Sequence, residues 1–523
     1  MRKLSSYLLV LFFLTVVVER AFPQSNRLLR GEINAKDYDF LYFIPVGENG
    51  LITLVHYAKF RSSHDFWRIN LYSENLNLLH QRDFQTGPGH KLIEYNDDKD
   101  SILYAFFAEK GGSSKYEVLK YNYKKDKIKI TVAQGDAGSS YEHFDVLGKA
   151  YFVAGIKNPS ALAYFGQVLF SFTIVPLFTG AKIYKAYPKI FYNKGDEHKN
   201  INLNLKGESM IMASKTNKAS GLYSLIVKNF YKNKSSLHYY EFDEEGQMVR
   251  HNTLKNLDTK NLLSGELITI NDTLFSFVGT YNDDRKHRLT SQKEATGIFV
   301  STIYKGRELL CKFHPFYTFT NAKKALDYFN RKRYEENKRK GHNMILGFNL
   351  LMHQDIIKTD SLYLLLAESY YPEYHYETYS NFYGSFYNDQ IFDGFRFSNA
   401  FATAFDKEGN LVWDNTFDIS EIISYNRDEN VVAYYDKSDK TVVLLYYFNG
   451  FIYSQVIKGN EVLYRKDRTE VRTVNEHENV LYENYGKIYH WYGPYFLLTG
   501  YQVVADSHGK KRKVYFFLKI GFE

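Results

Sequence analysis

Residues 359–368 read TDSLYLLLAE and residues 439–447 read DKTVVLLYY, and in each a polar turn precedes an unbroken apolar run. The pattern occurs eight times, with starts between 49 and 88 residues apart. A run that is apolar throughout, rather than alternating, is typical of a strand covered on both faces. The other six copies are NGLITLVHY (49–57), KDSILYAFFAE (99–109), GKAYFVAG (148–155), GESMIMAS (207–214), NDTLFSFVG (271–279) and YGPYFLLTG (492–500).

A second pattern, a hairpin with an acidic-glycine turn, follows several of these runs. Residues 241–249 (EFDEEGQMV) and 404–412 (AFDKEGNLV) match each other closely. Asp243 and Asp406 can accept bonds from the backbone ahead of them, and the glycine can take a positive φ. Each period then holds about four short strands, which are one before the apolar run, the run itself and the two arms of the second hairpin. Such units predict an all-β fold over residues 26–523, a single β-propeller of seven or eight four-stranded blades with eight favoured.

The last period lacks one strand. After the final apolar run only residues 511–521 (KRKVYFFLKIG) remain to form a strand. We expect residues 27–35, near the start of the chain, to supply the missing strand. Such an exchange would close the ring with paired strands and leave no open edge.

The composition indicates a folded and exported protein. Aromatic residues make up 17% of the chain, which argues against disorder. Residues 1–25 predict a signal peptide, because a basic start precedes the apolar run 7–18, which is too short to span a bilayer. A retained signal anchor is the alternative. We expect a periplasmic, extracellular or cell-surface protein with no membrane span after signal cleavage.

The first of two insertions is basic. Residues 321–343 (NAKKALDYFNRKRYEENKRKGHN) carry eight Lys or Arg against three Asp or Glu, and lack Gly, Pro and β-branched residues up to Gly341. This composition predicts a helix. Lys332 and Arg333 are its candidate contacts for an anionic partner, and a solvated helix lying across one face of the ring is the alternative.

The second insertion, residues 369–393, is rich in tyrosine. It reads as an extended loop or extra hairpin between the middle strands of one blade. Exposed rings there could stack on a ligand, whereas half-buried rings would only pack on the protein. The candidate binding residues are Tyr370, Tyr371, Tyr374, Tyr376, Tyr379, Phe382 and Tyr383. The acids Glu368, Glu373, Glu377 and Asp389 lie among these rings in the sequence and could bond to hydroxyls.

Catalytic signatures are missing from the sequence. It contains no G-x-S-x-G, H-E-x-x-H, P-loop or G-x-G-x-x-G motif, and no paired Cys or His spacing for zinc. We therefore assign no catalytic residue, cofactor or metal. The preferred interpretation is a binding or scaffold module for a protein or polysaccharide at the cell envelope, with no nucleic-acid partner. The alternative is a carbohydrate-active enzyme, a glycoside hydrolase or lyase, with carboxylates around the propeller channel.

The signal peptide, the run LLLAESYYPEYHYETYS (364–380) and the segment FATAFDKEGNLVWDNTF (401–417) carry a resemblance. With these features the chain resembles tyrosine-rich secreted proteins of Bacteroidetes. The resemblance implies an exported, propeller-like protein and carries over no catalytic residue.

Overall fold

The structure is a computed structural model of the chain, and nearly all of its regular structure is β-strand. It describes residues 29–522 except 36–37, 58–62, 99–100, 110–114, 137–138, 158–184, 193–197, 233, 284–293, 326–334, 337, 341–345, 381–385, 420–421 and 472–477. The helical elements named in this part of the chain are four 3-10 helices, η1 (Gly47–Asn49), η2 (Leu257–Thr259), η3 (Phe316–Thr318) and η4 (Ala322–Ala325).

The strands of the described residues form eight antiparallel sheets, numbered here in chain order. Sheet 1 is β2 (Tyr38–Pro45), β3 (Leu51–Tyr57), β4 (Asp65–Tyr72) and β5 (Leu78–Thr86). Sheet 2 is β6 (His90–Asp97), β7 (Ile102–Glu109), β8 (Lys115–Asn122) and β9 (Lys127–Gln134). Sheet 3 is β10 (Ser139–Leu147), β11 (Ala150–Lys157), β12 (Lys185–Tyr192) and β13 (His198–Asn200). Sheet 4 is β14 (Glu208–Asn217), β15 (Leu222–Tyr231), β16 (Lys234–Phe242) and β17 (Met248–Thr253).

The later sheets follow the same four-stranded plan, with additions in sheet 6. Sheet 5 is β18 (Asn261–Thr269), β19 (Leu274–Asn282), β20 (Gly297–Tyr304) and β21 (Arg307–Pro315). Sheet 6 is β22 (Leu350–Met352), β24 (Leu362–Ser380), β25 (Phe386–Asp406) and β26 (Leu411–Asp418), with the short β23 (Ile357–Lys358) and β27 (Ile423–Ser424) beside them. Sheet 7 is β28 (Val431–Asp436), β29 (Thr441–Phe448), β30 (Phe451–Lys458) and β31 (Glu461–Glu470). Sheet 8 is β32 (Asn479–Tyr492), β33 (Tyr495–Ala505), β34 (Lys511–Gly521) and β1 (Leu29–Asn34).

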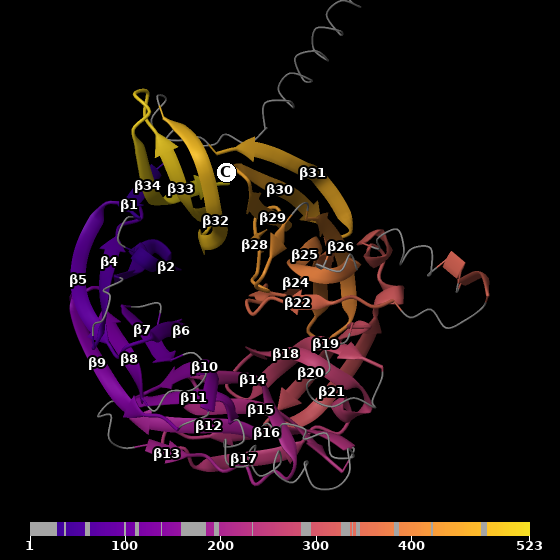
Figure 1. Cartoon of the computed structure of the whole chain (residues 1–523). Coiled ribbons are helices and arrows are strands. Elements are labelled where there is room, and N and C mark those ends of the chain that lie inside the picture. The colour runs from indigo at the N-terminus through magenta and orange to yellow at the C-terminus, as the bar shows by residue number, and fades with distance from the viewer. Residues whose placement is uncertain are drawn as a thin grey trace, which may run out of the picture.

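The sheets lie in chain order around an open middle (Figure 1). Strands β2, β6, β10, β14, β28 and β32 lie near the middle, and β5, β9, β13, β17 and β31 lie on the outside. A buried cluster of apolar side chains joins each sheet to the next, as Trp67 and Phe107 do between sheets 1 and 2. A further cluster, with Phe43, Trp491 and Phe517, joins sheet 8 to sheet 1. Apolar area buried between sheets is therefore the main source of stability.

This packing explains the uninterrupted apolar runs. Seven of the eight residues of β29 are buried, because sheets 6 and 8 cover its two faces. Each predicted apolar run lies in a different sheet, and seven of the eight form the second strand of their sheet. The exception is run 207–214, which lies in β14, the first strand of sheet 4. The pattern predicted this run to be the second strand of its sheet. The second strand is β15, which is just as apolar as β14.

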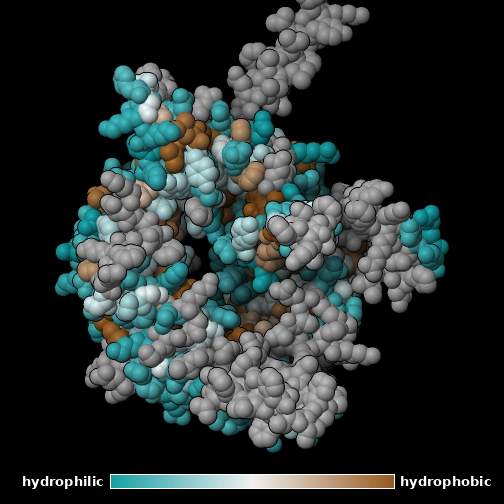
Figure 2. Space-filling model, in the orientation of Figure 1, coloured by the Kyte–Doolittle hydropathy of each residue, from teal (hydrophilic) through white to brown (hydrophobic). Residues whose placement is uncertain are grey.

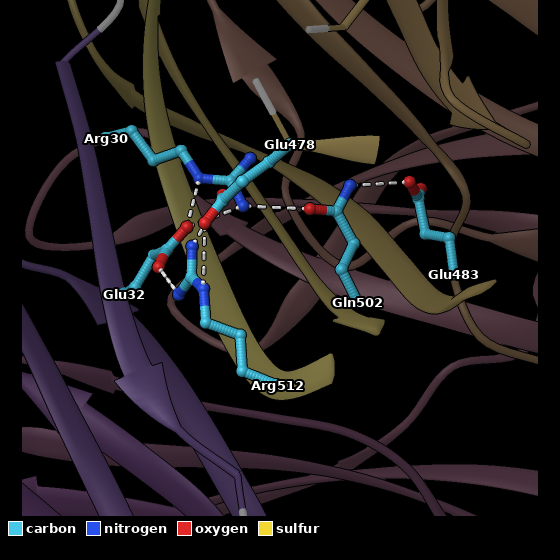
Figure 3. A network of polar contacts seen from close by, with 6 residues as sticks. All are labelled: Arg30, Glu32, Glu478, Glu483, Gln502 and Arg512. Atoms are coloured by element: carbon cyan, nitrogen blue, oxygen red, sulfur yellow. Dashed lines mark hydrogen bonds and ion pairs between the residues drawn. The ribbon is translucent and has the colours of Figure 1, made fainter. Parts of the chain in front are cut away.

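The predicted strand exchange between the two ends of the chain is confirmed. β1 pairs with β34 from Leu29 opposite Lys519 to Asn34 opposite Val514. Figure 3 shows the polar network that holds β1 against the end of the chain. The Arg30 side chain is 1% exposed, and it donates to Glu32 at 2.9 Å and to Gln502 at 2.8 Å. Gln502 donates in turn to Glu483 at 2.7 Å, so the buried guanidinium is fixed by a connected set of acceptors.

The two acidic-glycine turns also form as expected. Asp243 accepts a bond from the Gln247 amide at 2.7 Å, and Asp406 accepts one from the Asn410 amide at 2.7 Å. Gly246 has φ +67° and Gly409 has φ +74°, which a side chain would oppose. A third turn of this kind, at Asp506, was not predicted, and its carboxylate accepts from the Lys510 amide at 2.9 Å.

A continuous helix over 321–343 is not among the elements of the described residues. The segment begins as the 3-10 helix η4, whose Ala322 and Ala325 are buried beside sheet 6. Later in the segment, residues 335, 336, 338 and 339 are helical and the Lys340 amide donates to the Glu336 carbonyl, and most of the rest lies outside the described residues. The start of the segment is therefore a 3-10 helix and not the predicted helix, because packing against sheet 6 selects a tighter turn there. No helix in the described ranges combines the length and apolar character that a membrane crossing requires.

Candidate functional site

The tyrosine-rich insertion is a continuation of two strands of sheet 6. β24 and β25 pair from Leu362 opposite Asp406 to Ser380 opposite Phe386. We call residues 370–397 the arm, and its tip, 381–385, lies outside the described residues. The prediction of an extended loop is therefore corrected, because aromatic and β-branched cross-strand pairs extend the ladder in place of a loop. The alternative prediction, an extra hairpin, is the one observed.

One face of the arm is aromatic. Tyr370 packs on Phe395 with ring centroids 5.4 Å apart, Phe395 lies 5.1 Å from Phe392, and Phe392 lies 5.4 Å from Tyr374. A β-bulge at Gly394, where φ is +134°, brings Phe392 onto the face that Phe395 occupies. The aromatic face is therefore a continuous row of rings along the arm.

The opposite face of the arm is charged. Arg396 makes a bidentate pair with Glu373 at 2.6 and 2.8 Å. His375 contacts Asp393 at 2.5 Å and Glu377 at 3.3 Å, and these bonds raise the pKa of His375. The Tyr379 hydroxyl donates to Glu377. The arm is therefore amphipathic, because successive residues of a strand point to opposite faces.

The structure divides the predicted binding residues into three groups. Tyr371, Tyr374, Tyr376 and Tyr379 are exposed by 41 to 70%, with Tyr376 the most exposed. Tyr370 is half-buried, and the Arg427 guanidinium covers its ring at 5.9 Å. Phe382, Tyr383, Lys332 and Arg333 lie outside the described residues. The base of the arm is therefore packed, and the rings farther out are exposed as a binding surface requires.

Glu368 shows how the arm is anchored. The sequence placed it among the rings, but it is fully buried below them. Its carboxylate accepts from the Asn430 amide at 2.7 Å, the Val431 amide at 2.8 Å and the His353 Nε2 at 2.8 Å. Segment 425–431 therefore runs from the aromatic face, where Tyr425 contacts Phe392, to the start of β28.

At the open middle between the sheets lies a cavity of about 1200 Å³, and the face shown in Figure 2 is hollowed there. The strand nearest the middle in each sheet, or a segment next to it, contributes to its wall. Its charged and histidine side chains are Glu48, Glu94, Asp97, His143, Asp145, Lys215, Glu266, His353, Asp355, Glu429, Lys487 and His490. Seven are carboxylic acids and two are lysines, so the cavity is acidic although the chain carries a net charge of +8.

Three of these acids titrate far above their usual range. Burial, followed by the charge of Asp145, raises the pKa of Glu94 to about 8. Burial also raises the pKa of Glu266 to about 7 and that of Asp145 to about 6, although Lys215 opposes both increases. Burial lowers the pKa of His143 to about 4. Such a set in a cavity is typical of a functional site, because each group interacts with the others through a poorly solvated space.

The cavity was not found from the sequence. Its acids come from five separate sheets or their connections, and each follows or precedes an ordinary apolar strand. A usable signal was the polar residue within the first strand of each period, as in KLIEYND (91–97) and GELIT (265–269). That strand lies nearest the middle, so its polar side chains face the cavity.

No protein-family model and no curated protein matches the chain. Among solved structures, prolyl oligopeptidase B from Galerina marginata is 9% identical with a TM-score of 0.37, covering 91% of this chain and 57% of that one. The β-propeller domain of the Trilobed protease from Pyrococcus furiosus is 9% identical with a TM-score of 0.30, and the match covers 81% of this chain and 98% of that one. The acylaminoacyl peptidase of Pyrococcus horikoshii is 8% identical with a TM-score of 0.36, and the match covers 89% of this chain and 58% of that one. The chain thus spans little more than half the length of the two peptidases.

Proposed function

We propose that this chain is a closed, eight-bladed β-propeller that is exported and acts as a non-catalytic binding module at the bacterial cell envelope. Eight sheets in ring order and a buried cluster between sheets 8 and 1 support the closed ring. The strand exchange of β1 with β34 supports it as well. The predicted signal peptide, residues 1–25, supports export, and the resemblance to secreted proteins of Bacteroidetes supports the envelope.

The observation that carries the binding role is the aromatic face of the arm. Tyr374 is 45% exposed and Tyr376 is 70% exposed, on a ribbon whose other face is fixed by ion pairs. Large rings exposed on a rigid element lose little conformational entropy on binding, and tyrosine is enriched where partners make their strongest contacts. The arm is thus already ordered in the free protein.

The edges of the arm favour a protein partner over a polysaccharide. In the described residues, 372–380 of β24 and 386–394 of β25 pair with each other and with no third strand. Such edges present unpaired amides and carbonyls to an incoming extended segment. A polysaccharide could use the rings and would leave this backbone edge unused.

Binding to the arm is testable with two exposed-ring variants. The double variant Tyr374→Ala and Tyr376→Ala should bind envelope proteins about 30-fold more weakly, as expected when about 2 kcal/mol of aromatic contact is lost. Tyr304→Ala is the matched control, because Tyr304 is 40% exposed at the turn between β20 and β21 of another sheet. Retention of envelope protein by the wild type and the control, with loss by the double variant, supports the proposal. Equal retention by all three contradicts it, and binding only on a glycan array assigns the arm to a polysaccharide.

The cavity supports a second candidate function, a carbohydrate-active enzyme. Glu94 keeps its proton near neutral pH beside other carboxylates, as the acid of a glycosidase pair must. The test is release of reducing sugar from envelope polysaccharides. Activity that Glu94→Gln abolishes would support the enzyme, and no release by the wild type favours the binding module.

A further inference from the structure

Two histidines lie side by side on the outer hairpin of sheet 4. His238 belongs to β16 and His251 to β17, and these strands pair with Tyr240 opposite His251. Both imidazoles therefore lie on the same face of the hairpin, because alternate residues of a strand share a face. The Nδ1 nitrogen of His238 lies 3.2 Å from the Nε2 nitrogen of His251. The two residues are 13 positions apart, so no short metal-binding motif marks them in the sequence.

Neighbouring side chains hold both rings in this arrangement. Tyr240 stacks on His251 with ring centroids 4.4 Å apart and an interplanar angle of 3°, and the buried Tyr240 hydroxyl donates to the Leu203 carbonyl at 3.3 Å. The Ser236 hydroxyl oxygen lies 3.0 Å from His238 Nε2 and can accept its proton, which leaves a lone pair on Nδ1. Metal-binding histidines are normally oriented in this way, by a hydrogen bond to the ring nitrogen that does not bind the metal.

Both rings can act as neutral ligands. Partial burial lowers the pKa of His238, and the charge of His251 lowers it further. Partial burial also lowers the pKa of His251. Within the described residues the Nδ1 nitrogen of His251 makes no hydrogen bond, so it can carry the proton of that ring. The two facing nitrogens then both present lone pairs, which a positive ion between them would satisfy.

The separation of the two nitrogens suits a single metal ion. Histidine nitrogens bind zinc at about 2.0–2.1 Å, so two of them on one ion lie about 2.9–3.4 Å apart for angles of about 90–109°. The observed 3.2 Å lies within this range. The His251 side chain is exposed, so an ion can reach it from solvent and the ring can turn in the plane of its stack on Tyr240 to meet the ion.

We propose that His238 and His251 bind one late first-row divalent metal ion, such as Zn²⁺, Ni²⁺ or Cu²⁺, with water in its remaining positions. Imidazole is a preferred ligand of these ions, whereas Mg²⁺ and Ca²⁺ prefer oxygen. The described residues hold no group of three or more His, Cys, Asp or Glu that could bind a metal, so this is an open, two-ligand site. The ion would join β16 to β17 and stabilise the outer edge of sheet 4. The site lies on a different sheet from the arm, so the inference does not depend on the role of the arm.

Calorimetric titration of the purified protein tests the proposal, without a histidine tag and in a buffer that does not bind metals. The probes are NiCl2, ZnCl2 and MgCl2. We expect Ni²⁺, Zn²⁺ or both to bind and to raise the melting temperature, and Mg²⁺ to do neither. No binding of Ni²⁺ and Zn²⁺, or equal binding of Mg²⁺, would overturn the proposal.

Two variants of the pair and one surface variant assign the site. His238→Ala and His251→Ala should each weaken binding by about tenfold or more and abolish the rise in melting temperature, because each removes one of the two ligands. His508→Ala, which removes an exposed histidine between β33 and β34, should leave both measurements unchanged. Circular dichroism establishes that each variant is folded, and the exposed His251→Ala serves if His238→Ala is not. Equal binding by wild type and the folded variants of the pair, or an equal loss in His508→Ala, would overturn the proposal.

Discussion

Replacing Glu94 by glutamine should make the protein more stable at high pH and leave its stability unchanged at low pH. The pKa of Glu94 is raised from 4.5 to about 8, first by burial and then by Asp145. Below about pH 4.5 the carboxyl is protonated in the folded and unfolded states, so it contributes no difference. At a pH between the pKa of the unfolded state and that of the folded state, the folded protein holds a proton that the unfolded chain has released. The free energy of unfolding of the wild type therefore falls as pH rises, and the loss is complete above about pH 8.

The magnitude follows from the size of this shift. At about 1.4 kcal/mol for each pH unit, a rise from 4.5 to about 8 corresponds to about 5 kcal/mol. Solvent in the cavity reduces this free energy, and we expect the wild type to lose about 3–5 kcal/mol of stability at high pH. Glutamine is uncharged throughout and keeps a carbonyl oxygen that can accept the Phe144 amide. The gain of Glu94→Gln over the wild type should therefore grow from near zero at about pH 5 to this value at about pH 9.

Urea denaturation at a series of pH values, in an amine-free buffer, measures this gain. Glu245→Gln serves as the control, because Glu245 is exposed at an outer turn. A difference between Glu94→Gln and wild type that stays constant across the series would refute the reasoning, and so would a variant that loses stability at high pH. Either result would mean that Glu94 is ionised at no cost in the folded protein.

Three further changes test other parts of the structure. Arg30→Ala should lower the free energy of unfolding by about 2–3 kcal/mol in urea denaturation, because it leaves the oxygen of buried Gln502 without its donor and removes one of the two arginines that bind Glu32. A loss under about 1 kcal/mol would mean that the β1 network does not stabilise the exchange. Gly409→Ala should cost about 1–2 kcal/mol by the same measurement, because its φ is +74°, and an unchanged midpoint would contradict the turn geometry. Glu368→Gln should destabilise the protein by about 2–4 kcal/mol and speed amide hydrogen exchange at Val431, because the glutamine side chain cannot accept all four donors that bind the carboxylate. Unchanged exchange at Val431 would contradict the anchoring role.

The repeat and the strand exchange could be predicted because each rests on local chemistry. An apolar run between polar turns marks a strand covered on both faces, and a missing final strand points to the start of the chain. The error at residues 207–214 arose because β14 and β15 are both apolar, so composition did not distinguish the first strand from the second.

The arm and the cavity were harder to predict, for different physical reasons. The rings of the arm were recognised, but the bulge at Gly394, which selects the face that Phe392 occupies, depends on the pairing of two strands. Glu368 was placed among the rings because they follow it in sequence, yet its backbone donors come from residues about 60 positions later. The cavity depends on strands from all eight sheets meeting at one place, which no short segment encodes.

The central claim is that the outer rings of the arm touch a protein partner, and photo-crosslinking tests it most directly. A benzophenone amino acid is placed at position 376 of the arm or at position 304 of sheet 5, where the native tyrosines are 70% and 40% exposed. After irradiation of intact cells, the account predicts a discrete cross-linked protein from position 376 that is missing from position 304. The same products from both positions, or none from position 376, would contradict it.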